Sequence, residues 1–136
     1  MNILEGISSE ENIAELFRVI GQPARIQILL LIGKGEACVC HLEAHLGLRQ
    51  AAISQHLMVL RDAGLVSTQR DGRNIYYRLT HPQVLDLLDQ SAAILGLPQA
   101  DLEKLKAQPL TPCPCPHCNP DKNEAPVCVD RQSTCN

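Results

Sequence analysis

Residues 38–64, CVCHLEAHLGLRQAAISQHLMVLRDAG, decide the fold of this chain. They contain two segments with apolar residues at helical spacing, 38–47 and 49–64, and each segment closes on a glycine, which is a common helix stop. A short helix, a tight turn and a second helix with polar residues near its start follow the order of a helix-turn-helix. The sequence therefore predicts a helix-turn-helix whose second helix lies in residues 49–64.

The apolar spacing changes directly after this pair of segments. Residues 65–79, LVSTQRDGRNIYYRL, form two short β runs that meet at Asp71 and Gly72, a dipeptide that favours a hairpin turn. A hairpin in this position is the wing of a winged helix-turn-helix. We therefore expect a mainly α fold with one β-hairpin.

Further helical patterns flank this unit, and a different kind of sequence follows them. Helices are predicted in residues 8–20, 21–35, 80–96 and 99–107, and the second of these is apolar almost all round, so it should be central and buried. From Pro109 the chain is rich in proline and holds five of the seven cysteines. We expect a folded domain in residues 1–108 and a tail in residues 109–136 that is disordered unless it binds metal.

Charge is distributed unevenly along the chain. Residues 49–78 contain five arginines and two aspartates, whereas the whole chain has a net charge of -3. A basic segment on an acidic body is expected where one face meets phosphates. Polar residues on an exposed helix could simply be solvated, but the hairpin beside them favours DNA. The candidate base-reading residues are Gln50, Ser54 and Gln55, the candidate phosphate contacts are Arg49, Arg70 and Arg73, and His56 either contacts a phosphate or packs.

Other features limit the classes of function. The start of the chain has no signal-peptide pattern, and the longest apolar run, ILLLI, is too short for a membrane span. We therefore expect a cytoplasmic protein with no membrane contact, where metal or redox chemistry explains seven cysteines better than disulfides do. No pair of nucleophile and base and no glycine-rich phosphate loop is present, so we expect no enzyme.

Cys38 and Cys40 stand at the predicted start of a helix. Residues two apart point to different sides of a regular helix, so their sulfur atoms can converge only where the backbone is frayed or extended. The end of a helix is such a place, and its free N–H groups also favour the thiolate form that binds metal. Cysteines are often small buried hydrophobic residues. We interpret this pair as ligands of a sensed ion.

Three stretches resemble the ArsR/SmtB family of winged-helix metalloregulatory repressors. They are ELFRVIGQPARIQILLLI, ACVCHLEAHLGLRQAAISQHLMVLRDAGLV and RDGRNIYYRL, and the resemblance runs from about Ala14 to Asp89. It implies a homodimer packed through the first and last helices, here about Ser9 to Ile20 and Pro82 to Leu95. It also implies binding to double-stranded palindromic operator DNA, which ends when an effector binds.

The resemblance further implies the kind of effector. In this family CVC at the third helix is typical of sensors for arsenic, antimony, cadmium and lead. The arsenite type adds a cysteine three positions after the second, where this chain has Glu43. Because As(III) and Sb(III) prefer three thiolates, we expect the missing ligand to come from Cys113, Cys115 or Cys118, within a subunit or across the dimer. Arsenite or antimonite is favoured, and Cd(II), Pb(II) and zinc stay open.

Several alternatives remain at this point. The cysteines could sense oxidants or persulfides, and the Cys-Pro pairs at 113–114 and 115–116 could bind heme. A metal-buffering protein without DNA binding would also use many thiols. His41 and His45 could bind zinc but fit a polar helix face, and His117 lies among the tail thiols. Asp86 and Asp89 are interpreted as solvated surface, although zinc sensors of the family use acids and histidines on this helix.

Overall fold

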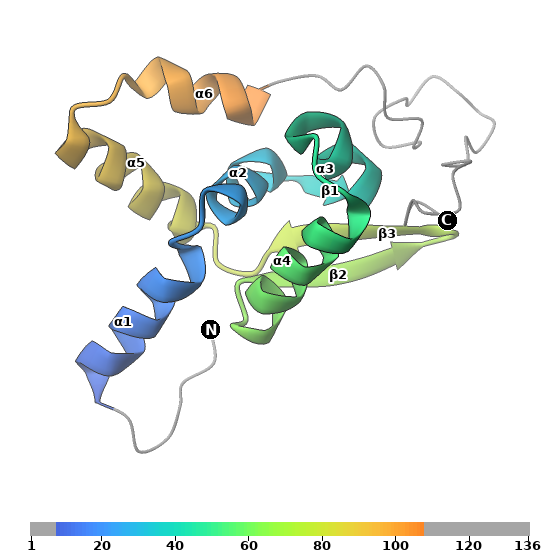
Figure 1. The fold of residues 1–136 in the computed structure, drawn as a ribbon, viewed down its shortest axis with the longest axis horizontal. Coiled ribbons are helices and arrows are strands. Elements are labelled where there is room, and N and C mark those ends of the chain that lie inside the picture. Colours follow the sequence, from blue (N-terminus) through green and yellow to red (C-terminus); the bar gives the residue numbers. More distant parts are fainter. Residues whose placement is uncertain (1–7, 108–136) are drawn as a thin grey trace.

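The computed structural model describes residues 8–107, and these confirm a mainly helical winged helix-turn-helix (Figure 1). The six helices of this part are α1 (Ser9–Ile20), α2 (Pro23–Ile32), α3 (Val39–Leu46), α4 (Gln50–Asp62), α5 (Gln83–Leu95) and α6 (Gln99–Ala107). The three strands are β1 (Glu36–Cys38), β2 (Val66–Asp71) and β3 (Asn74–Leu79). The predicted tail, residues 109–136, lies outside the described residues.

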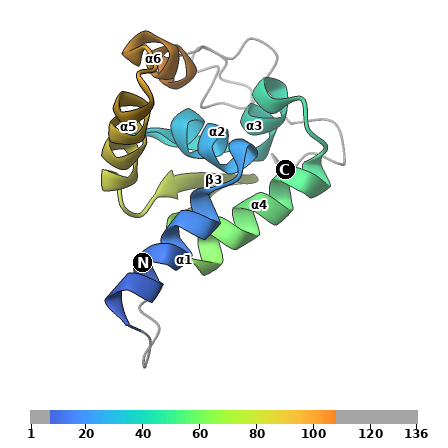
Figure 2. The same ribbon diagram turned by 60° about the vertical axis from the view of Figure 1, so that its left-hand side comes forward.

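Helix α2 is the centre of the domain, as its apolar sequence predicts. In both views it lies between α5 and α6 on one side and α3 and α4 on the other (Figures 1 and 2). Neighbours cover its second half, residues 28–32, on every side, and Ile28, Leu29 and Leu30 are at most 1% exposed. Pro23 takes the first helical position, where a missing N–H costs nothing. Burial of α2 therefore holds the helix-turn-helix and the sheet to one core.

The helix-turn-helix consists of α3 and α4, joined by a turn at Gly47. Gly47 has φ 65°, a left-handed conformation that favours glycine, and its N–H donates to the carbonyl of Glu43. Helix α4 buries one row of side chains against the core, formed by Ile53, Leu57 and Leu60. The opposite side of α4 is therefore left for another contact.

The wing is a three-stranded antiparallel sheet in the order β1-β3-β2. The predicted hairpin is confirmed: Asp71 pairs with Asn74, and Gly72 in the turn has φ 63°. The third strand was not predicted, because a three-residue strand shows no period. Residues 36–38 pair with β3, with Cys38 opposite Tyr76, so Cys38 ends a strand as well as standing at the start of the predicted third helix. β3 can accept β1 because its other edge still has hydrogen-bonding groups to satisfy.

Two helices leave apolar residues exposed. Helix α1 projects from the body in both views, and Ile13 and Phe17 are about half exposed. In α5, Val84 and Leu88 are buried, while exposed apolar residues lie at its far end and just beyond it. Those residues are Ile94, Leu95 and Leu97. The homodimer through these helices stays a prediction. Within residues 8–107, no helix has the length and apolar character needed to cross a membrane.

Adjacent residues of α4 provide a test of this packing. Leu57 is 1% exposed and Met58 is 60% exposed. We expect Leu57→Ala to lower the free energy of unfolding by about 2 to 5 kcal/mol, because it leaves a cavity in the core. Met58→Ala should change it by less than about 0.5 kcal/mol. Urea denaturation followed by circular dichroism measures both, and equal losses would contradict the orientation of α4.

Candidate DNA interface and cysteine pair

The outer side of α4 carries the residues predicted to read bases. Gln55 is exposed, and Gln50 and Ser54 are half-buried on one flank. Arg49 is the N-cap residue, is exposed, and makes no side-chain cap hydrogen bond. The first turn of α4 contains no acidic residue, so its positive dipole end is not neutralised there. This end of α4 suits a phosphate backbone.

The wing presents two of the arginines predicted to contact phosphates, and a further arginine of the basic segment forms an ion pair within the sheet. Arg70 lies near the end of β2, Arg73 lies in the turn beside Gly72, and both are exposed. Arg78 instead forms an ion pair across the sheet, with its guanidinium 2.8 Å from the carboxylate of Glu36 in β1. The exposed wing arginines can therefore contact phosphates, while Arg78 ties β1 to β3.

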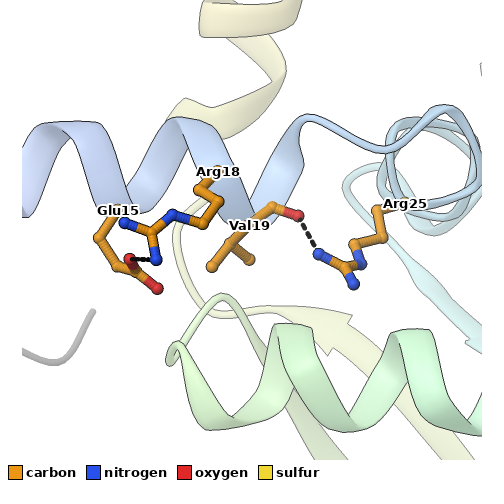
Figure 3. A network of polar contacts seen from close by, with 4 residues as sticks. All are labelled: Glu15, Arg18, Val19 and Arg25. Atoms are coloured by element: carbon orange, nitrogen blue, oxygen red, sulfur yellow. Dashed lines mark hydrogen bonds and ion pairs between the residues drawn. The ribbon is translucent and has the colours of Figure 1, made fainter.

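His56 contacts Arg25, a residue that the sequence analysis missed. Arg25 Nε donates to His56 Nδ1 at 3.2 Å. Arg25 Nη1 donates to the carbonyl of Val19 at 2.9 Å, and Figure 3 shows this second bond. The pKa of His56 is lowered from its ordinary value, mainly because the ring is partly buried and to a smaller extent because Arg25 is positively charged. His56 is thus a neutral acceptor that links α4 to α2 and the end of α1. The partners are 31 residues apart, so no local pattern could have revealed the contact.

Cys38 and Cys40 meet at the junction of β1 and α3. Their sulfur atoms lie 3.1 Å apart, and Cys38 and Cys40 are only 1% and 8% exposed. Cys38 is the N-cap residue of α3 in extended conformation, with φ -90° and ψ 168°, and its Sγ accepts the His41 N–H at 3.4 Å. The extended backbone that convergence requires is therefore present. Any change at Cys38 Sγ acts on a helix cap and on the end of a strand at once.

Two further candidate ligands, both histidines, lie in α3. His41 and His45 have ring centroids 5.5 Å apart, so they form one face of α3. Within residues 8–107, no group of three or more His, Cys, Asp or Glu side chains is arranged to hold a metal ion. The other predicted ligands lie outside the described residues; they are Cys113, Cys115, Cys118 and the candidate His117. The described part of the chain thus offers the cysteine pair as two ligands of an incomplete set.

The two aspartates of α5 lie beside a pocket of about 550 Å³. Its acidic lining consists of Glu36, Asp86, Asp89 and Glu103, and Lys34 is the basic residue among the lining groups. Asp86 is exposed and Asp89 is half-buried, so only Asp86 is fully part of the solvated surface that we expected. Because Glu36 is paired with Arg78, one of these carboxylates is already neutralised.

Comparison with known proteins identifies the kind of chain that carries this fold. Residues 22–68 match the model of the arsR family of bacterial regulatory proteins. The chain is 38% identical over 90 residues to the biofilm growth-associated repressor of Agrobacterium fabrum, covering 66% of this chain and 77% of that one. It is 40% identical over 96 residues to the arsenic resistance transcriptional regulator ArsR1 of Pseudomonas putida, covering 70% and 73%.

Solved structures agree with the sequence relatives. NolR from Sinorhizobium fredii superposes with a TM-score of 0.59 at 35% identity, over 70% of this chain and 100% of that one. The transcriptional repressor BigR from Xylella fastidiosa superposes with a TM-score of 0.58 at 33% identity, over 62% of this chain and 87% of that one. The fold and its relatives define a winged helix-turn-helix DNA-binding regulator. The chain belongs to the ArsR family of transcriptional repressors, which confirms the expectation that it is not an enzyme.

The contact between Arg25 and His56 predicts a pH dependence of stability. The unfolded chain takes up a proton at His56 near the ordinary pKa of 6.5, whereas the folded state resists it. The contribution to stability is therefore present above pH 6.5 and is lost as the pH falls below that value. We expect the melting temperature of His56→Gln to fall less than that of the wild type between pH 7.5 and pH 5.5, conditions chosen to bracket the ordinary pKa. Parallel pH profiles would contradict the assignment.

Proposed function

We propose that this chain represses transcription by binding operator DNA, and that it leaves the operator when a thiophilic ion binds the thiolates of Cys38 and Cys40. Arsenite or antimonite is the favoured ion. The observation that carries this proposal is the 3.1 Å distance between the two sulfur atoms at the start of α3. Soft thiolate ligands select soft ions and disfavour magnesium or calcium. The regulators of Pseudomonas putida and Staphylococcus xylosus among the relatives carry arsenic resistance in their names, which supports the same class of effector here.

The operator contacts are assigned to α4 and the wing. Gln50, Ser54 and Gln55 are proposed to meet base edges, and Arg49 at the start of α4 is proposed to hold a phosphate. Arg70 and Arg73 would hold the backbone beyond the groove. His56 would act through its contact with Arg25, by fixing how α4 sits on α2. Exposure of the arginines and the uncapped start of α4 support this assignment.

A homodimer is part of the proposal. The apolar residues exposed on α1 and at the end of α5 support it, since large exposed apolar groups commonly mark an interface; they are Ile13, Phe17, Ile94 and Leu95. A two-fold dimer would present two α4 helices about one DNA turn apart, roughly 34 Å. A palindromic operator would match that spacing.

A third thiolate is needed to complete an arsenite or antimonite site. Glu43 occupies the position where arsenite sensors of this type have cysteine, and a carboxylate oxygen is a hard ligand that suits these ions poorly. We assign the missing ligand to Cys113, Cys115 or Cys118 of the tail, within a subunit or across the dimer. Cd(II) or Pb(II) could take four sulfur ligands from the same set.

The cysteine pair can influence DNA binding through two contacts. Cys38 is 1% exposed, so an ion reaches its sulfur only if the junction of β1 and α3 opens. That junction holds the cap of α3, which packs against α4, and it holds the pairing of Cys38 with Tyr76 in the wing. A tenfold loss of operator affinity needs about 1.4 kcal/mol of coupling. Losing a helix cap alone costs a comparable amount, about 1 kcal/mol.

Thiol oxidation is the second candidate signal, and the same distance favours it. The two sulfur atoms lie 3.1 Å apart, so in its reduced form the pair would need little movement to form a disulfide. The step removes two electrons and two protons, which hydrogen peroxide accepts to give two water molecules. Relatives in the solved structures include "Reduced HlyU" from Vibrio cholerae. Release of operator by peroxide without metal would favour this signal over an ion.

Release of operator DNA tests the proposed function directly. A labelled fragment of the gene's own promoter is bound under reducing conditions, and arsenite, antimonite, cadmium, lead and zinc are titrated while anisotropy is followed. We expect release by arsenite or antimonite, and a shift of the midpoint of at least about tenfold in Cys38→Ser and Cys40→Ser. Serine still caps a helix, so Cys38→Ser should keep its operator affinity.

The tail is tested with matched variants. Cys113→Ser/Cys115→Ser/Cys118→Ser should lose the response, while Cys128→Ser/Cys135→Ser, which changes the other two tail cysteines, should keep it. A full response of the triple variant would exclude the tail as the source of the third ligand. If the protein binds the operator but no ion releases it, the protein is still a repressor, and redox chemistry becomes the favoured signal.

Thermodynamic linkage gives an independent test of the mechanism. If the ion weakens operator affinity by some factor, the operator must weaken ion affinity by the same factor. We expect isothermal titration of arsenite to give an affinity at least about tenfold lower for the complex with DNA than for the DNA-free dimer. Equal affinities would show that the ion does not act through DNA binding.

A further inference from the structure

The most exposed row of side chains on α4 contains apolar residues. Ala51, Gln55, Met58 and Asp62 follow one another at spacings of four, three and four residues, and all four are exposed. This row lies opposite the buried row of Ile53, Leu57 and Leu60. Two of the first three outward residues are therefore apolar, although α4 buries its other large apolar residues in the core.

Met58 is the unusual member of the row. It is 60% exposed, while Leu57 beside it is 1% exposed, so the core does not need it. Its neighbours on the same face of the helix are polar or charged, including Gln55 and Arg61. A methionine in this position suits a partner that combines apolar groups with negative charge.

The major groove of DNA has this combination. Phosphates line both of its edges, and the C5 methyl group of thymine is the apolar group on its floor. Alanine and similar apolar side chains are known contacts of that methyl group, which cytosine lacks. Arg49 at the start of α4 and Arg61 near its end provide positive charge beside the row. This charge favours DNA over an apolar protein surface as the occupant.

We propose that Ala51 and Met58 contact thymine methyl groups and so select thymine at two positions of each operator half-site. This inference rests on the proposed placement of α4 in the major groove, and it does not depend on the effector. Gln55 lies between the two residues in the row and would hydrogen-bond the base edge between the thymines. Apolar contact then supplies the preference for thymine. It acts in addition to the hydrogen bonds that Gln50, Ser54 and Gln55 are proposed to make.

The length of the row agrees with contacts to neighbouring base pairs. Ala51 and Met58 are seven residues apart, which is about 10.5 Å along a helix axis, and about three base pairs at roughly 3.4 Å each span the same length. Asp62 follows on the same face, one turn after Met58. A carboxylate is repelled by phosphates, so the end of α4 must leave the groove after Met58. The two apolar residues therefore mark the limits of the segment that reads bases.

Removal of single methyl groups from the DNA tests the proposal. The full-length protein is used to select its best duplex from a random pool, and each thymine of that duplex is replaced in turn by deoxyuridine, which lacks only the methyl group. We expect wild-type affinity to fall about fourfold at each contacted thymine, as burial of one methyl group predicts. The affinity of Met58→Gln should not change when deoxyuridine replaces thymine at one of these positions, and that of Ala51→Ser should not change at the other.

Control variants separate the possible results. Met58→Leu keeps an apolar side chain and should keep the sensitivity, whereas Gln55→Ala should bind more weakly and still respond to deoxyuridine. If no thymine is sensitive in the wild type, or if Met58→Gln and Ala51→Ser retain the wild-type pattern, the proposal is wrong. If Arg49→Ala and Gln55→Ala also bind like the wild type, the placement of α4 in the groove is wrong as well.

Discussion

The burial of the second half of α2, residues 28–32, is the constraint on which the rest of the domain depends. A helix with apolar residues all round must be covered by other elements, and in this chain the helix-turn-helix, the wing and the last two helices provide the cover. Each covering element then has one side in the core and one side outside. The outer sides of α4 and the wing are left exposed and are proposed to meet DNA, and those of α1 and α5 retain apolar residues.

The same arrangement explains why the cysteine pair is well placed for control. Cys38 ends the strand that joins the wing and caps the helix that packs on α4. A buried sulfur atom at such a junction cannot change its bonding without affecting both the start of α3 and the end of β1. The ion pair of Glu36 and Arg78 and the contact of Arg25 with His56 fasten these elements from other directions. In the proposed mechanism, regulation thus requires only a local change at a position that two elements share.

Much of the fold and part of the site could be predicted from local patterns. Helical spacing, glycine stops and the Asp71-Gly72 turn are local signals, and the helices and the hairpin that they predict are present. The convergence of Cys38 and Cys40 was also predictable, because extended backbone is the only way for residues two apart to meet. Strand β1 and the Arg25 contact were not predictable, since both depend on partners more than thirty residues away.

The sequence by itself determined the class of the domain, its basic reading segment and the presence of a thiol pair, because each depends on residues close together in the chain. Only the tertiary structure decided which side chains of α4 face outward, that His56 turns to Arg25, and that Cys38 ends a strand as well as capping a helix. The physical reason is that burial depends on what packs against an element. A helix pattern fixes which residues share a face, but the neighbours supplied by the fold determine whether that face is covered.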